Sequence, residues 1–283
     1  MDLSNWGLWD ARWVVTIGFI TLLLSAEWIV PFRIPTQSKL EHVSINLVIF
    51  GVNSLALQIL ATSTLLLWSS YIGTEGWGLL HHLGLAPVPN IFLSIVLLDL
   101  VTYGIHRLFH RVPFLWRLHR AHHSDLDMDA TTSIRFHLGE VLVTMSIKGF
   151  SVTALGISPF GFLVSETLTL SAGLFSHANL RLPRGPEWAL RLAIVTPRMH
   201  EVHHSRRSAE HNANLGAVFS GWDRLFGTYS MGIGPHDIQF GLDDYPALED
   251  VTLFRFCRMP FDSACRRIDH KPCRSTPIAA SVE

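Results

Sequence analysis

The segment IFLSIVLLDLVTYGIHRLFHRVPFLWRLHRAHHS, residues 91–124, joins a long apolar run directly to a cluster of histidines and arginines. The apolar part, residues 91–105, predicts a membrane-embedded helix, because its side chains match the hydrocarbon interior of a bilayer. Proline disfavours helical conformation at the residue before it, so Pro113 is expected to end this helix. We expect residues 114–118 at the membrane surface and a new helix beginning at residues 119–124. The segment predicts a histidine-rich site where a helix leaves the membrane.

The composition is that of an integral membrane protein with a sizeable polar part. Hydrophobic residues make up 48% of the 283 residues and charged residues 16%, against about 25% charged in globular domains. The mean hydropathy is +0.29. The net charge of −1 gives no electrostatic basis for binding nucleic acid. The acidic N-terminus lacks a basic region, so we expect no cleavable signal peptide.

Three further apolar runs predict the rest of the fold. Residues 13–32 are long enough for one helix across a hydrocarbon core of about 30 Å. Residues 43–72 allow a tilted helix or one with an interfacial extension. Residues 141–176 contain GISPFG at 156–161, which predicts a turn between two shorter helices. The expected fold is an all-α integral membrane protein with about four transmembrane helices, or three plus a re-entrant hairpin, and a cytosolic helical cap.

These runs divide the chain into three parts. Residues 1–90 carry the N-terminal transmembrane helices, residues 91–230 the third helix, the hairpin and the histidine-rich cap, and residues 231–283 a polar C-terminal cytosolic tail. From about Cys257 onward we expect this tail to be peripheral or partly disordered, because it is polar and shows no clear periodicity. Its three cysteines match neither a complete disulfide framework nor a zinc motif, so we expect reduced thiols: Cys257, Cys265 and Cys273.

Lysine and arginine in the loops predict the orientation. Arg33 and Lys39 follow the first run, residues 73–90 contain neither residue type, and several arginines follow the third run and the hairpin. Positive charge favours the cytoplasmic side. We therefore expect the N-terminus outside and both histidine-rich regions on the cytoplasmic face of a bacterial inner membrane or an ER-like membrane.

A polar stripe follows one face of the third helix. Asp99, Tyr103, His106 and His110 recur at intervals of three or four residues, which places them on a single helical face. Two histidines four residues apart can bind one metal ion, and a nearby carboxylate or hydroxyl can orient the imidazole. We predict that Asp99 and Tyr103 support the two histidines in this way, because ionisable groups at membrane depth are costly without a function.

The pattern HxxHH occurs twice, and its members lie close together on a helix. A random HxxHH is expected about 0.05 times in a chain of this composition, so two chance copies have a probability on the order of one in a thousand. Histidines buried for packing alone would each need a polar partner. The two motifs comprise His119, His122 and His123, and His200, His203 and His204.

The histidine pattern predicts a site for two metal ions. No cysteine lies near it, as most closed zinc sites would require, and nitrogen-only sites suit iron, copper or zinc. Eight or nine histidines provide about four ligands for each of two ions, and a redox role favours iron. A zinc-protease reading of HEVHH, with Glu201 as the base, explains only one of the clusters.

The ordered blocks between residues 90 and 229 resemble the fatty acid hydroxylase/sterol desaturase superfamily of membrane di-iron oxygenases. They are DLVTYGIHRLFH, HRAHHS, RFHLGE, SHANL, TPRMHEVHHS and NANLGAVFSGWDRLFGTY. The resemblance implies a four-helix membrane stem with a cytosolic cap, and residues 91–230 as the catalytic domain. It also assigns the closing block GWDRLFGTY, residues 221–229, a structural role in which Trp222, an Asp–Arg pair and a glycine turn close the cap.

The resemblance implies the following metal-binding and catalytic residues: His106, His110, His119, His122, His123, His177, His200, His203 and His204. It places His137 beside the ligands rather than among them, with Glu140 as an orienting carboxylate. The remaining histidines outside the motifs are expected to be ordinary surface or interfacial residues: His42, His81, His82, His236 and His270.

The function implied by the resemblance is O₂-dependent hydroxylation of a C–H bond in a membrane lipid, such as a fatty acyl chain or a sterol. The cofactors would be two iron ions, with O₂ as co-substrate. The chain contains no haem, flavin or CxxC iron–sulfur motif, so a separate electron donor is expected, either a ferredoxin or a cytochrome with its reductase.

Two alternatives remain open at this point. A desaturase would use the same histidines, and they do not distinguish the two reactions. A membrane metal-binding or transport protein would also contain histidines, but they should be spread through the membrane depth, with signs of inverted repeats.

Overall fold

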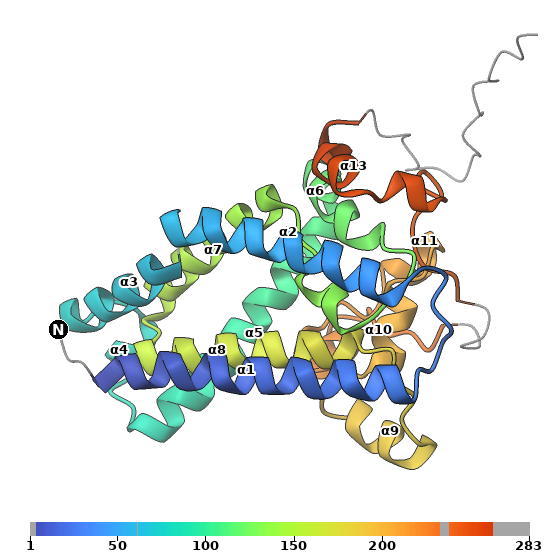
Figure 1. Cartoon of the computed structure of the whole chain (residues 1–283). Helices are drawn as coiled ribbons and strands as arrows, with labels where there is room; N and C mark the ends of the chain where they lie inside the picture. The colour runs from blue at the N-terminus through green and yellow to red at the C-terminus, as the bar shows by residue number, and fades with distance from the viewer. Residues whose placement is uncertain (1–3, 61, 233–237, 263–283) are drawn as a thin grey trace, which may run out of the picture.

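The computed structural model describes residues 4–60, 62–232 and 238–262 (Figure 1). Within these ranges the chain forms helices and loops, with isolated β-bridges and no strand. Long helices make up the bundle: α1 (Ser4–Ile29), α2 (Lys39–Leu60), α3 (Thr62–Glu75), α5 (Pro87–Arg111), α7 (Leu138–Leu155) and α8 (Pro159–His177). The predicted all-helical class is therefore confirmed for the described residues.

Short helices form a cap at one end of the bundle, on the right in Figure 1. They are α6 (Pro113–His123), η1 (Ala130–Ile134), α9 (Arg184–Arg191), α10 (Pro197–His203), α11 (Ser208–His211), α12 (Gly221–Leu225), η3 (Leu248–Asp250), α13 (Leu253–Arg258) and η4 (Met259–Phe261). One further short helix, α4 (Leu79–His82), precedes α5. Helix α1 packs along α8, and α5 contacts both α6 and α8.

Three helices are long and apolar enough to cross a membrane: residues 12–29 of α1, α5 and α7. Large apolar side chains point outward from this region, as a lipid-facing surface requires; Phe150 is 75% exposed. Within the predicted run 43–72, α2 packs against η1 and α3 packs against α7 and α8, and residue 61 between them lies outside the described residues. Four complete crossings, and the alternative re-entrant hairpin, remain predictions.

The predicted hairpin is present as α7 and α8. Gly156 ends α7 in the left-handed conformation, with φ of 69°. A Cβ at this position would lie 2.5 Å from the carbonyl oxygen of Trp77, so only glycine fits here. Ser158 then caps α8 by accepting a hydrogen bond from the Gly161 N–H. Lys148 and Glu166 link the two helices through a 2.7 Å ion pair between buried side chains.

The predicted break at Pro113 is present, but the following helix begins earlier than expected. Val112 is extended, with φ of −95° and ψ of 115°, and Pro113 takes the first position of α6. The histidines of HRAHH therefore lie at the C-terminal end of α6 rather than at the start of a new helix. The reason is that proline ends one helix yet is well suited to begin the next.

The described part of the predicted tail, residues 238–262, packs on the cap. Phe256 and Met259 are buried, and Arg120 of α6 donates to the carbonyl oxygens of Met259 and Asp262. Of the tail from about Cys257, only residues 257–262 are described; Met259 and Pro260 are buried there, and η4 contacts α6. Residues 263–283, to which most of the expectation applies, lie outside the described residues. Cys257 is an exposed free thiol. Four residues named above lie outside the described residues: Cys265, Cys273, His236 and His270.

Candidate metal centre

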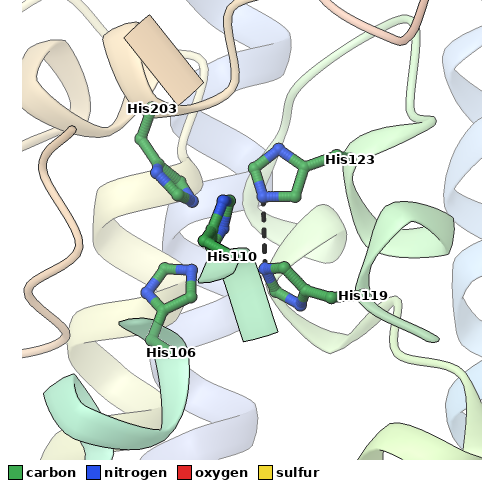
Figure 2. A group of neighbouring side chains, drawn as sticks. All are labelled: His106, His110, His119, His123 and His203. Carbon is green, nitrogen blue, oxygen red and sulfur yellow. Dashed lines mark hydrogen bonds between the residues drawn. The ribbon is translucent and has the colours of Figure 1, made fainter. Parts of the chain in front are cut away.

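The nine histidines named from the sequence gather into two groups. In each group the ring nitrogens lie within 4.8 Å of one another. The first group is His106, His110, His119, His123 and His203, whose rings converge in Figure 2. The second group is His122, His177, His200 and His204.

Each HxxHH motif serves both groups. In α6 the i and i+4 pair, His119 and His123, joins the first group, whereas His122 joins the second. At α10 the order is reversed, so that His200 and His204 join the second group and His203 the first. Neither group is therefore drawn from a single stretch of the chain. Rotation by about 100° per residue turns i+3 away from the i, i+4 pair and towards the neighbouring group.

The two groups fit metal ions by their donor chemistry. Burial, reinforced by neighbouring histidines, holds the pKa of His122, His123, His200 and His204 well below the usual value, so these rings are neutral and offer lone pairs. Several buried ring nitrogens have no hydrogen-bond partner within the described part of the chain, a costly state that a metal ion would relieve. They are both nitrogens of His110, Nδ1 of His123 and His200, and Nε2 of His203 and His204. Five and four nitrogens suit iron, copper or zinc.

Hydrogen bonds to oxygen atoms of residues outside the two groups fix the orientation of five histidine rings. In each case Nδ1–H donates to an oxygen, which leaves Nε2 free to bind an ion. The acceptors are Glu140 Oε1 for His119 at 2.6 Å, the Leu215 carbonyl for His106 at 2.9 Å, the Ala213 carbonyl for His203 at 2.9 Å, the Gly173 carbonyl for His177 at 2.8 Å, and the Arg135 carbonyl for His122 at 3.2 Å.

Of the residues predicted to support the ligands, the structure brings Glu140 alone into contact with a grouped histidine, among the described residues. Asp99 instead accepts hydrogen bonds from the N–H groups of Val218 and Phe219 and from the Trp222 indole. It therefore anchors the loop whose Leu215 carbonyl orients His106. Asp99 precedes His106 on α5 by about two helical turns.

Two other predicted supporting residues also lie apart from the groups. The hydroxyl of Tyr103 is 2.9 Å from Thr228 Oγ1, and its ring stacks on Phe226. His137 caps α7, and its Nε2 donates to the Cys257 carbonyl. Both residues join parts of the cap rather than orient a grouped histidine.

Within the closing block GWDRLFGTY, Asp223 makes the hydrogen bonds that bear on the histidine groups. Its carboxylate accepts hydrogen bonds from the N–H groups of Leu215 and Gly216 and from the Thr228 hydroxyl. Arg224 donates to Ser220 and to the Arg191 carbonyl, and its charge acts on the neighbouring Asp223 carboxylate. Asp223 thus holds the loop that presents carbonyl oxygens to the first group.

A buried ion cluster beside the second group was not predicted. His42 is 4% exposed and lies between Asp125, at 2.8 Å, and Asp129, at 3.1 Å. Burial opposes protonation of His42, but the two carboxylates outweigh it and raise its pKa to about 10. The expectation of an ordinary surface histidine is therefore wrong. A polar residue starting an apolar helix and the acid-rich DLDMD after the first HxxHH were the available signals.

Residues around this cluster connect helix α2 to His122 of the second group. Asn46, also on α2, donates to Thr131 and accepts a hydrogen bond from Arg135, whose carbonyl orients His122. Glu27 of α1 accepts from the N–H of Ala130 in the same loop. Residues of the two N-terminal helices therefore complete the support of the site.

Comparisons with known proteins agree with this geometry. Residues 91–228 match the fatty acid hydroxylase family. The ornithine lipid hydroxylase OlsE of Rhizobium tropici is 33% identical over 54% of this chain and 45% of its own length. Human alkylglycerol monooxygenase is 30% identical over 46% of this chain and 28% of its own. Human cholesterol 25-hydroxylase is 26% identical over 53% of this chain and 52% of its own.

The matches thus span about half of each relative or less. No solved structure matches the chain. The ordered histidine blocks and the family match at residues 91–228 together support the resemblance of this part of the chain to the fatty acid hydroxylase/sterol desaturase superfamily.

Proposed function

We propose that the protein is an O₂-dependent di-iron oxygenase that hydroxylates a C–H bond of a membrane lipid. The observation that carries the proposal is the pair of groups with five and four buried histidines at one end of an apolar helical bundle. The relatives named above, which act on ornithine lipid, alkylglycerol and cholesterol, support a lipid as the substrate. Desaturation of the same kind of chain is the variant of this reaction that the histidines do not separate.

When bound, two iron ions would supply O₂ activation and the redox change that C–H hydroxylation requires. The chain's own residues hold the ring nitrogens neutral and fix their tautomers through the Nδ1–H bonds. Burial of the rings excludes water, which strengthens electrostatic interactions within the site. The reaction consumes two electrons and two protons per O₂, and we propose a separate donor, a ferredoxin or a cytochrome with its reductase, as their source.

We further propose that the site faces the cytoplasm. Arg33 and Lys39 follow α1 at the end of the bundle that holds the cap, and positive residues favour the cytoplasmic side. A lipid would then approach from the inner leaflet.

The proposal is tested by comparing the lipids of cells with and without the protein. The expected difference is a lipid heavier by one oxygen, or lighter by two hydrogens for desaturation. Purified protein should contain iron and consume O₂ when given a membrane lipid extract and a reductant. Protein that binds metal but never consumes O₂ under these conditions would support the metal-binding or transport alternative instead.

The contact between Glu140 and His119 gives a prediction about metal affinity. Glu140→Ala removes the acceptor of His119 Nδ1–H, so Fe²⁺ affinity at the first group should fall about 10–100-fold. Glu140→Gln retains an oxygen acceptor and should lose less. Equilibrium dialysis with elemental analysis measures both, with exposed Glu75→Ala on α3 as the control. Unchanged affinity in Glu140→Ala would contradict the orienting role.

A further inference from the structure

A cavity of about 490 Å³ lies between the α1–α2 connection, the loop after α6 and residues 238–248. This volume falls within the roughly 300–1,000 Å³ typical of small-molecule sites. None of the nine grouped histidines lines it, so the cavity is separate from the candidate metal centre. Figure 1 shows α1 and α2 meeting at the same end of the bundle as α10 and α11.

The cavity nevertheless adjoins the second histidine group. Asn179 and Arg206, which line it, follow His177 and His204 by two residues each. Two residues span at most about 7 Å even when fully extended. A ligand in the cavity is therefore held by the same backbone segments that carry the grouped histidines.

The cavity is amphipathic and lies at the level of the membrane surface. The stretch of α1 that can cross a membrane ends at Ile29, only four residues before Arg33 in the cavity wall. The wall also includes Ile34, which is 91% exposed, and Leu248, which is 43% exposed. Apolar residues open to the surroundings beside a polar interior match a lipid whose chains remain in the bilayer while its headgroup enters the cavity.

Both signs of charge line the interior. Arg33, Lys39 and Arg206 supply cations, and Asp127 and Asp129 supply carboxylates. Arg206 Nε is buried without a hydrogen-bond partner among the described residues, and its ion-pair partner Asp243 is 3.9 Å away. Arg33 already pairs with Glu201, Lys39 with Glu27 and Asp129 with His42. A neutral headgroup would desolvate Arg206 and Asp127 without pairing them, so the site penalises it. A purely anionic headgroup would meet the carboxylates without a cation of its own.

We propose that this cavity binds the zwitterionic headgroup of a membrane lipid, with a phosphate or carboxylate at the arginines and an ammonium group at Asp127. Thr36 and Gln37 already donate to Asp127, but a carboxylate has about four acceptor positions and retains capacity for an ammonium group. The proposal rests on the proposed function in one respect: the lipid bound in the cavity belongs to the class of lipid that the neighbouring metal centre oxidises.

The test measures lipid binding by native mass spectrometry on the full-length, metal-free protein in detergent. Three lipids with identical oleoyl chains are compared: phosphatidylethanolamine, phosphatidic acid and diacylglycerol. Phosphatidylethanolamine should bind at least about tenfold more tightly than diacylglycerol, since a charge-assisted hydrogen bond contributes about 1.5–3 kcal/mol. Phosphatidic acid, which lacks the ammonium group, should fall between them. Soluble phosphoethanolamine that binds as tightly as the lipid would overturn the assignment to a lipid.

Two variants and a matched control localise the binding. Arg206→Gln removes a cation, and Gln239→Trp fills the cavity from an exposed position in its wall without changing charge. Both should lose the preference for phosphatidylethanolamine. The control variant is Arg207→Gln, which changes the adjacent exposed arginine that does not line the cavity. This variant should retain the preference for phosphatidylethanolamine. Equal binding of all three lipids, or a preference that survives both variants, would overturn the proposal.

The measurement is independent of the reaction because no metal is present. If the protein oxidises lipid but shows no headgroup preference, the cavity proposal alone is refuted. Headgroup preference in a protein that never oxidises lipid would instead remove the proposed function and confine the cavity to lipid binding.

Discussion

Replacing His122 with alanine should strip the second histidine group of its metal and abolish lipid oxidation. This group has four ring nitrogens, and His122 Nε2 lies 3.2 Å from that of His177, so its loss leaves three donors and an open position. His203→Ala should act in the same way on the first group. Loss of an orienting contact alone weakens metal binding about 10–100-fold, so removal of a ligand should cost more than about 100-fold in affinity.

The measurement is iron content per chain after dialysis, together with O₂ consumption on lipid extract. The matched control is His82→Ala, which removes an exposed histidine of α4 outside both groups and should leave both quantities unchanged. Full activity in either His122→Ala or His203→Ala would refute the assignment of the groups as the metal centre.

Replacing His42 with leucine should produce the largest loss of stability among single substitutions outside the two groups. The change leaves Asp125 and Asp129 buried without the cation between them, and removing one partner of a buried pair costs about 3–5 kcal/mol. The loss should appear as a lower midpoint of thermal unfolding for the metal-free protein in detergent, with exposed His82→Leu as the control. An unchanged midpoint would show that the cluster contributes little to stability.

The same cluster gives stability a defined dependence on pH. The pKa of His42 is raised to about 10 in the folded protein, above its ordinary value near 6.5. Protonated His42 therefore stabilises the fold fully below about pH 6.5, and this contribution is lost as the pH rises towards 10. The midpoint of thermal unfolding of the unmodified protein should fall as the pH rises through this range. The His42→Leu variant should lack the part of this fall that comes from His42. Parallel profiles would contradict the assigned ion cluster.

Local features of the fold could be predicted because their causes are local. The break at Pro113 and the turn at Gly156 follow from the backbone restrictions of single residues. The repeated HxxHH likewise identified six of the nine grouped histidines, because its spacing is unusual by chance. In contrast, the run 43–72 contributes to α2 and α3, which have different packing partners, and spacing within the run does not encode those partners.

The features that were missed depend on contacts between residues far apart in the sequence. His42 meets Asp125 across 83 positions, and no periodicity links the two. Asp99 was placed on the correct helical face, yet its partners lie about 120 residues later, in the loop at Val218 and Phe219. The split of each HxxHH between two groups depends on how α6 and α10 face one another, and helix-packing angles are not readable from one motif.

The contacts of Glu27, His42 and Asn46 have a consequence for how the segment 91–228 is inherited. The recognisable segment, residues 91–228, lacks three of the side chains that hold its loop 125–135, namely those of Glu27, His42 and Asn46. The first two helices and the histidine-bearing segment therefore evolve under a common constraint: a recombination joint near residue 90 would pair one parent's loop with the other parent's supporting helices. Chimaeras of related proteins should retain function only when both sides of that joint come from the same parent.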